Sequence, residues 1–242
     1  MTGRVYGVGL GPGDPDLMSV KAHRLLKEAR HVAFFRKAGR PGQARRLANG
    51  LVPEDAIEYP MEYPVTTEIP VSDPRYNEVL SGFYSECTVR LKELARGGED
   101  VVVLCEGDPF FYGSFMHLYR RLADHVPTEV VPAITGMSAA WTATGQPITW
   151  GDDVLTVVMG TLPEDDLLRH MKGADAVVIM KIGRHMPKVM RALQTAGLFE
   201  AAWLVERASM PEQQVTRLVN ADSDKVVPYF SIIVVHGQGR RP

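Results

Sequence analysis

Five consecutive apolar residues, Val101–Cys105, lie between the acidic residues Asp100 and Glu106. A short apolar run bounded by charges is typical of a strand buried on both faces, as in a parallel sheet covered by helices. Other short β-rich runs alternate with segments of helical period on both sides of this one. Strand–helix alternation of this kind predicts an α/β fold.

The same patterns predict the other elements of the first half of the chain. Ser19 is expected to cap the first helix, because an apolar stripe at helical spacing follows it. No element is assigned to the proline-interrupted segment 53–74. The expected strands are Arg4–Leu10, His31–Phe35, Val101–Cys105 and Glu129–Val131, and the expected helices are Gln43–Gly50, Pro74–Arg96, Ser114–Ala123 and Gly136–Thr144.

A second domain is expected after Gln146-Pro147 and the polar residues that follow. Its late strands follow one another without intervening helices, which predicts an antiparallel end to the second sheet. We therefore expect two α/β domains, residues 1–148 and 149–242. The expected strands of the second are Leu155–Met159, Ala176–Met180, Ala202–Glu206, Val215–Leu218 and Tyr229–Val235, with helices near Glu164–Met171 and His185–Ala196.

The composition excludes several classes of protein. The 242 residues carry a net charge of -2, so no global field attracts nucleic acid or an anionic membrane. Cys87 and Cys105 have neither CxxC spacing nor a histidine at ligand spacing, so neither a disulfide framework nor a metal site is expected. Glycines interrupt the N-terminal apolar run, which excludes a typical signal peptide, and no run approaches the ~20 residues of a membrane helix. We expect a cytoplasmic protein.

A glycine-rich loop, Gly9–Pro15, follows the first strand at the position where dinucleotides or phosphates often bind. Its details oppose a phosphate cradle, since Pro12 and Pro15 each remove an N–H donor. Asp14 would place a carboxylate where a pyrophosphate should lie. Two alternatives remain: a structural turn, or a stiff ligand-binding loop at the carboxyl end of the strand.

A second glycine loop, Glu106–Phe115, follows the buried strand. Gly107 and Gly113 allow sharp turns and a close approach of the backbone to a ligand, and Asp108 can accept hydrogen bonds. Its consecutive aromatic residues can wall a flat apolar site or dock the loop onto the other domain. They are Phe110, Phe111 and Tyr112.

The order of three motifs resembles the tetrapyrrole methylase family along essentially the whole chain. The motifs are GxGPGDP at Gly9–Pro15, GDPxxxG at Gly107–Gly113 and Pro132–Thr135 before a helix of small residues. Ala133 and Gly136 depart from the glycine and serine that many relatives have there. Within the family, the segments Glu106–Leu122, Tyr63–Thr67 and Met180–His185 are similar to the branch that methylates the C-20 meso carbon of precorrin-2.

This resemblance implies an S-adenosylmethionine-dependent methyltransferase that acts on metal-free precorrin-2 or its cobalt counterpart. It also implies a homodimer, with the cofactor in a cleft between the two domains of each chain. Asp14, Glu106 and Tyr112 are candidates for a base that removes the proton from the methylated carbon. The implied cofactor contacts are Pro12, Gly107, Asp108, Pro109, Phe111, Thr135 and Gly136 from the first domain, and Lys181, Ala208 and Phe230 from the second.

Two segments are basic and contain no acidic residue. Residues 29–53 have six lysines and arginines, and residues 176–199 have four. Precorrin-2 carries multiple carboxylates, for which arginine forks are suitable partners. We assign Arg36, Lys37, Arg40 and Arg184 to these carboxylates. The alternative is a solvated helix face or a nucleic-acid patch.

Three other functions stay open on the sequence alone. An NADP-dependent oxidoreductase is favoured by Gly7 and Gly9 after a strand and by the basic pair Arg36-Lys37 after the next. A methyltransferase of the same fold that acts on ribosomal RNA or on diphthine precursors is the second, although the near-neutral charge weakens the RNA version. The third is a non-catalytic binding module.

Overall fold

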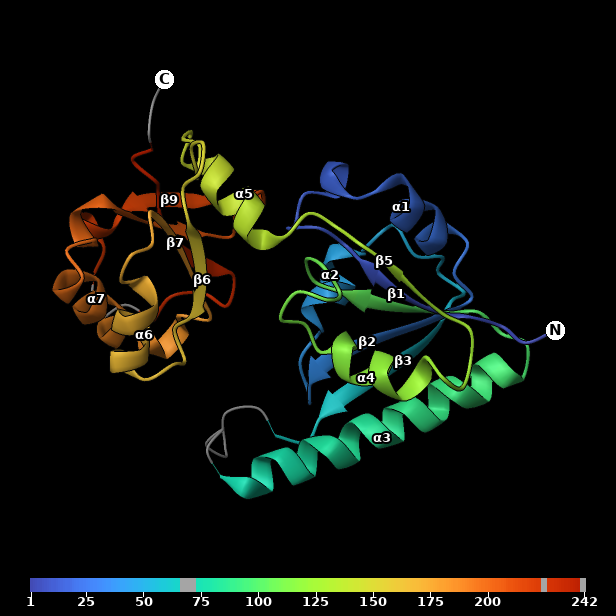
Figure 1. The fold of residues 1–242 in the computed structure, drawn as a ribbon. Coiled ribbons are helices and arrows are strands. Elements are labelled where there is room, and N and C mark those ends of the chain that lie inside the picture. The colour runs from blue at the N-terminus through green and yellow to red at the C-terminus, as the bar shows by residue number, and fades with distance from the viewer. Residues whose placement is uncertain (66–72, 223–225, 240–242) are drawn as a thin grey trace. The chain divides into compact units, whose positions relative to one another are not determined.

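The computed structural model describes residues 1–65, 73–222 and 226–239 and divides into two compact units, Met1–Thr135 and Gly136–Pro242 (Figure 1). The boundary expected after residue 148 is therefore too late in the chain. The reason is helix α5 (Gly136–Ala143), whose Ala139 and Ala140 are buried in a core of the second unit. The predicted cofactor cleft between the domains stays a prediction.

The first unit contains a five-stranded sheet in which every strand pair is parallel, in the order β3-β2-β4-β1-β5. All residues of β4 are buried, as its apolar sequence predicts. The strands are β1 (Val5–Gly9), β2 (His31–Lys37), β3 (Ile57–Tyr63), β4 (Val101–Cys105) and β5 (Thr128–Val131).

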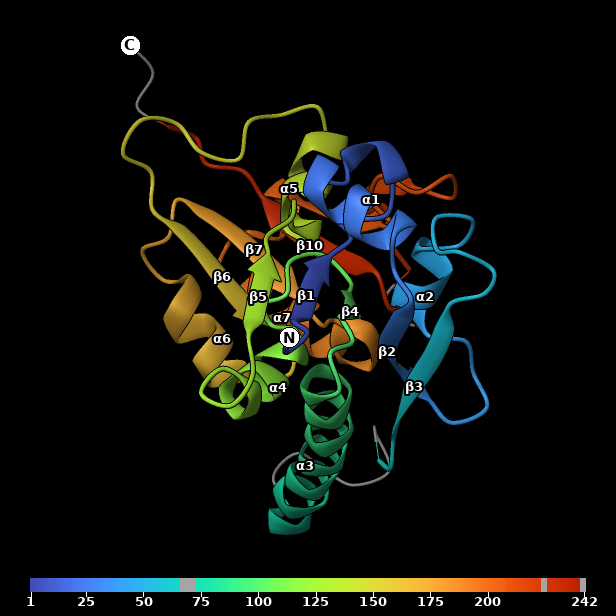
Figure 2. The same ribbon diagram turned by 90° about the vertical axis from the view of Figure 1, so that its right-hand side faces the viewer.

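Helices cover both faces of this sheet. Helices α1 (Val20–Lys27) and α2 (Gln43–Leu47) lie on one face, and α3 (Pro74–Arg96) and α4 (Phe115–Leu122) lie on the other (Figures 1 and 2). Successive residues of β4 alternate between the two cores, because side chains of a strand point to opposite faces. As predicted, Ser19 caps α1: its side-chain oxygen accepts a hydrogen bond from the Ala22 N–H at 3.1 Å.

Strand β3 was not predicted, because Pro60 interrupts its sequence. A proline cannot donate to the ladder, and it is tolerated mainly at sheet edges. β3 is the edge strand and pairs only with β2 among the described residues. The polar, proline-containing sequence is therefore compatible with a strand at this one position of the sheet.

The second unit contains a mixed sheet in the order β6-β7-β10-β8-β9. β6 and β7 are parallel, whereas β10 is antiparallel to both β7 and β8, and β8 is antiparallel to β9. The predicted antiparallel end of the sheet is thus confirmed. The strands are β6 (Leu155–Met159), β7 (Ala176–Met180), β8 (Ala202–Glu206), β9 (Gln214–Arg217) and β10 (Ser231–Val235).

The second sheet is also covered on both faces. Helices α6 (Glu164–Met171) and α7 (Met186–Thr195) pack against Val177 and Ile179, and α5 packs against Val178 on the opposite face. Short 3-10 helices, η2 (Gly183–His185), η3 (Phe199–Ala201) and η4 (Leu218–Asn220), connect the elements. Within the three described ranges, no helix is both long enough and apolar enough to cross a membrane.

Candidate functional site

The two glycine loops of the first unit meet at the carboxyl ends of the neighbouring strands β1 and β4. Their backbones are hydrogen-bonded, from the Leu10 N–H to the Cys105 carbonyl at 2.9 Å and from the Gly107 N–H to the Gly11 carbonyl at 3.0 Å. The chain leaves β1 towards α1 on one face and leaves β4 towards α4 on the other. Ligands of open α/β sheets bind at such a switch point.

A third loop, Pro132–Thr135 after β5, joins the other two at Gly9. A Cβ atom at Gly9 would lie 2.6 Å from the Ala133 Cβ atom and 2.7 Å from the Gly107 carbonyl oxygen. These distances are shorter than a carbon atom tolerates, so only glycine allows the three backbones to approach this closely. The predicted contacts Pro12, Gly107, Asp108, Pro109 and Thr135 lie on these three loops.

The Asp108 carboxylate holds two of the loops together. One of its oxygens accepts a hydrogen bond from the Phe110 N–H at 2.9 Å, and the other accepts one from the Ala133 N–H at 2.9 Å. Both bonds are charge-assisted, which makes them stronger than bonds between neutral groups. Asp108 therefore positions the backbone around a ligand, a role that sequence reasoning missed because Ala133 lies far along the chain.

The aromatic residues of the second loop diverge. Phe110 packs edge-on against Tyr119 with ring centroids 4.8 Å apart, whereas Phe111 contacts Tyr112 at 4.8 Å. Tyr112 has a backbone φ of 54°, a left-handed conformation that costs a non-glycine residue roughly 1–2 kcal/mol. Such strain is concentrated at functional sites. The Tyr112 side chain is exposed and the Phe111 side chain is half-buried.

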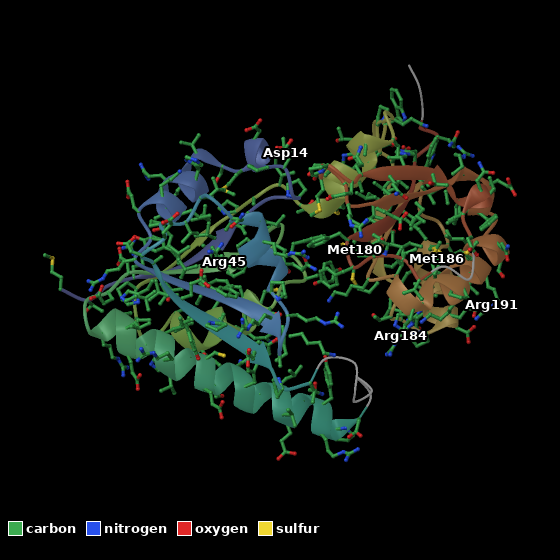
Figure 3. All side chains as sticks on the ribbon, turned by 180° about the vertical axis from the view of Figure 1, so that it is seen from behind. Asp14, Arg45, Met180, Arg184, Met186 and Arg191 are labelled. Atoms are coloured by element: carbon green, nitrogen blue, oxygen red, sulfur yellow. The ribbon has the colours of Figure 1, made fainter. Side chains whose placement is uncertain are left out.

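Asp14 caps the short 3-10 helix η1 (Pro15–Leu17) that begins at the end of the first loop (Figure 3). Its side chain accepts a hydrogen bond from the Asp16 N–H at 2.9 Å. The carboxylate thus occupies the turn at which a dinucleotide would place its pyrophosphate, and Pro12 and Pro15 offer no N–H groups there. A loop with these missing N–H donors and with a carboxylate at its tip opposes the oxidoreductase hypothesis and suits a ligand without phosphate.

Glu106 begins the second loop, and one of its carboxylate oxygens accepts a hydrogen bond from the Ala44 N–H of α2 at 3.1 Å. Burial raises the pKa of Glu106, and this hydrogen bond opposes the rise. All three candidate bases, Asp14, Glu106 and Tyr112, lie at the same edge of the first sheet.

The predicted contacts of the second unit, Lys181, Ala208 and Phe230, also share one sheet edge. β7 and β8 both run antiparallel to β10, so the ends of β7 and β8 lie beside the start of β10. Lys181 follows β7, Ala208 follows β8 and Phe230 precedes β10. The Arg207 N–H donates to the Phe230 carbonyl at 2.6 Å.

Three residues on these loops adopt positive φ values without being glycine: Lys181 at 53°, Arg207 at 49° and Ser209 at 64°. Partial burial lowers the pKa of the Lys181 amine. Sequence reasoning missed Arg207 and Ser209, since neither residue type signals a left-handed backbone. Gly136 begins α5, and a Cβ atom there would make only an ordinary 3.6 Å contact with Ile232, so this departure from the family pattern is sterically neutral.

The residues assigned to substrate carboxylates fall in both units. Arg36, the penultimate residue of β2, forms an ion pair with Glu62 at 2.6 Å, while Lys37 at the end of the strand and Arg40 beyond it are exposed. Arg184 is exposed on η2 in the second unit (Figure 3). Thr66 and Thr67 of the family-like segment lie outside the described residues. The described parts of the chain contain no cluster of three or more His, Cys, Asp or Glu side chains that could hold a metal ion.

Comparisons with known proteins agree with this geometry. A precorrin-2 C(20)-methyltransferase from Sinorhizobium is 45% identical over 240 residues, which covers 99% of this chain and 98% of the relative. A cobalt-precorrin-2 C(20)-methyltransferase from Salmonella typhimurium is 26% identical, with 98% of each chain covered. The crystal structure of uroporphyrin-III C-methyltransferase from Thermus thermophilus, complexed with S-adenosyl homocysteine, superposes with a TM-score of 0.68 at 29% identity, covering 97% of both chains.

The family model of the Tetrapyrrole (Corrin/Porphyrin) Methylases matches residues 4–222, which include all three loops of the first unit and the ends of β7 and β8 in the second. The identity with the Sinorhizobium relative extends over nearly the full length of both proteins. The chain belongs to the tetrapyrrole methylase family.

Proposed function

We propose that this protein is an S-adenosylmethionine-dependent C-methyltransferase that methylates the C-20 meso carbon of precorrin-2 to give precorrin-3A in cobalamin biosynthesis. The observation that carries the proposal is the 45% identity with the Sinorhizobium precorrin-2 C(20)-methyltransferase over nearly the whole of both chains. The Salmonella relative, which is named for the cobalt-containing substrate, is 26% identical, so the metal-free substrate is favoured.

The loops of the first unit fit S-adenosylmethionine. The first loop lacks N–H groups at Pro12 and Pro15 and carries the Asp14 carboxylate, which suits a cationic ligand without phosphate. Because residue 9 is a glycine, the backbones of the three loops can lie close together. Their remaining polar groups can therefore approach a ligand closely. The structural relative with bound S-adenosyl homocysteine supports the same cofactor for this chain. The contacts predicted for Lys181, Ala208 and Phe230 belong to this proposal.

The protein's main catalytic contribution is positioning. S-adenosylmethionine supplies an electrophilic methyl group on a sulfonium, and the electron-rich meso carbon of the substrate is the nucleophile. Loops that hold donor and acceptor carbons about 3–3.5 Å apart and in line can remove roughly 7–11 kcal/mol from the barrier. The hydrogen bonds that the Asp108 carboxylate accepts from the Phe110 and Ala133 N–H groups hold two of these loops in place.

A proton then leaves the methylated carbon. Among Asp14, Glu106 and Tyr112, Glu106 has a raised pKa, the shift that brings a carboxylate closer to the working range of a general base near neutral pH. Glu106 is our first candidate for this base. A homodimer, a cytoplasmic location and the absence of nucleic-acid or membrane partners complete the proposal, and these rest on the sequence and on the family resemblance.

The test is anaerobic incubation of the protein with methyl-labelled S-adenosylmethionine and enzymatically made precorrin-2, with and without cobalt, followed by mass spectrometry of the pigment. We expect one added methyl group at C-20 on the metal-free substrate. Faster transfer to the cobalt form would move the protein to the anaerobic route. Cofactor binding without transfer to either pigment would contradict the substrate and leave the family unchanged.

A further inference from the structure

A pocket of about 480 Å³ lies beside α2 in the first unit. Arg36 of β2 and two arginines of α2, Arg45 and Arg46, line it (Figure 3 labels Arg45). Phe34 contributes an apolar wall, and Asn49 and Glu58 contribute polar groups. Sequence reasoning counted Arg45 and Arg46 in the basic segment but did not assign them to a site.

The charged side chains at this pocket have a net positive charge. Arg36 forms an ion pair with Glu62 at 2.6 Å, and Arg45 forms one with Glu58 at 2.6 Å. Within the described ranges, the exposed Arg46 side chain has neither an ion pair nor a side-chain hydrogen bond. The two pairs hold Arg36 and Arg45 in place, while Arg46 leaves one positive charge uncompensated. Such an arrangement suits an anion that accepts planar, bidentate hydrogen bonds.

The pocket is connected to the loops of the candidate site. Glu106, the first residue of the second glycine loop, accepts a hydrogen bond from the Ala44 N–H of α2 at 3.1 Å. Arg36 lies near the carboxyl end of β2, and all strands of this sheet end at the same edge. The part of the pocket that Arg36 lines therefore lies at the loop edge, whereas Glu58, near the start of β3, lies towards the other edge of the sheet. A side arm of a ligand at the loop edge can enter the pocket past Arg36.

We propose that this pocket binds a peripheral carboxylate of the tetrapyrrole substrate, with Arg46 as its main partner. This inference rests on the proposed function and adds a specificity-determining residue to it. Arg36 keeps its predicted role, whereas the exposed Lys37 and Arg40 are not part of the pocket lining.

The experiment compares Arg46→Gln, Arg46→Lys and the control Arg24→Gln, which removes an exposed arginine of α1. The probe is uroporphyrin III, a stable tetrapyrrole with acetate and propionate arms, titrated by fluorescence in the presence of S-adenosylhomocysteine. Loss of a charge-assisted hydrogen bond is expected to weaken porphyrin binding roughly tenfold in Arg46→Gln. Arg46→Lys is expected to lie in between, and Arg24→Gln to match the wild type.

S-adenosylhomocysteine affinity, measured on every variant, is expected to stay constant and shows that each variant is folded. Porphyrin affinity that is equal in Arg46→Gln and wild type would overturn the inference. So would Arg46-dependent binding of inorganic phosphate without Arg46-dependent binding of the porphyrin. Methyl transfer to precorrin-2 is assayed separately on the wild type, so its failure would reject the proposed function while Arg46-dependent porphyrin binding would still support the pocket.

Discussion

At the scale of single residues, Glu106 connects the second glycine loop, Glu106–Phe115, to helix α2 beside the pocket that Arg36, Arg45 and Arg46 line. It begins the loop that carries Asp108, and its carboxylate accepts a hydrogen bond from Ala44 of the helix that lines the arginine pocket. Burial penalises its ionised form and raises its pKa. One side chain thus combines a structural hydrogen bond with a raised pKa.

Replacing Glu106 by glutamine is expected to change how stability depends on pH. Because the pKa of Glu106 is higher in the folded than in the unfolded chain, the folded state keeps its proton over a pH range in which the unfolded state has lost it. The wild-type free energy of unfolding therefore loses a contribution as the pH rises through that range. Glu106→Gln keeps an acceptor for the Ala44 N–H and does not ionise. Its stability relative to the wild type is expected to increase from acidic to neutral pH.

Urea unfolding of both proteins at a series of pH values measures this difference. Glu54→Gln, which removes an exposed carboxylate, is the control for the loss of one negative charge. If the difference from the wild type follows the same pH curve for Glu106→Gln and Glu54→Gln, Glu106 has no raised pKa.

At the scale of elements, the buried strands were the most predictable part of the fold. Val101–Cys105, Ala176–Met180 and Ala202–Glu206 were predicted with the bounds that the structure has. A strand that is buried on both faces has a short, nearly continuous apolar sequence, and such a sequence can be recognised without any structure. β3 has no such signal, since it lies at a sheet edge and contains Pro60.

The positions of the loops at the candidate site could be predicted from the sequence, whereas the hydrogen-bond partners of their side chains could not. The order of strands and glycines places Gly9–Pro15 and Gly107–Gly113 at the carboxyl edge of the sheet. The bond from the Ala133 N–H to Asp108 joins residues 25 positions apart, and that from the Ala44 N–H to Glu106 joins residues 62 positions apart. No local pattern encodes such pairs, because they depend on which strands become neighbours.

Gly9→Ala tests the convergence of the three loops. The new Cβ atom would lie 2.7 Å from the Gly107 carbonyl oxygen, so the backbone of at least one loop has to move. We expect at least a tenfold loss of S-adenosylmethionine affinity, roughly 1.4 kcal/mol, measured by isothermal titration calorimetry. The control is Gly82→Ala in α3, where an added Cβ meets nothing within 4 Å. It is expected to raise stability by roughly 0.5–1 kcal/mol and to leave affinity unchanged. Wild-type affinity in Gly9→Ala would contradict the proposal that the cofactor binds at these three loops.

At the scale of the whole molecule, each unit has its own cores. Two clusters of buried side chains cover the faces of the first sheet, and two others cover the faces of the second, with no residue shared between the units. An autonomous core is the property that allows a domain to fold alone. The boundary between the units therefore has a measurable consequence for the stability of fragments.

The segment between the observed and the expected boundary contributes to the second unit in two ways. Helix α5 covers one face of the sheet with Ala139 and Ala140. The His236 ring is hydrogen-bonded to the Thr144 hydroxyl at 2.9 Å and to the Pro147 carbonyl at 3.0 Å. A fragment that begins after residue 148 lacks all of these contacts and leaves an apolar sheet face exposed.

A fragment of residues 136–242 is expected to unfold cooperatively in urea, and a fragment of residues 149–242 is expected to be less stable by at least about 2 kcal/mol, or unfolded. Two lost hydrogen bonds at about 1 kcal/mol each set the lower limit, and the apolar face that α5 covers adds to it. Circular dichroism of both fragments at the same concentration, followed through urea titration, measures the difference. The longer fragment with Ala140→Asp, which puts a charge into the core under α5, is the control and is expected to behave like the shorter one. Equal unfolding midpoints and slopes for residues 136–242 and 149–242 would show that α5 does not belong to the second unit.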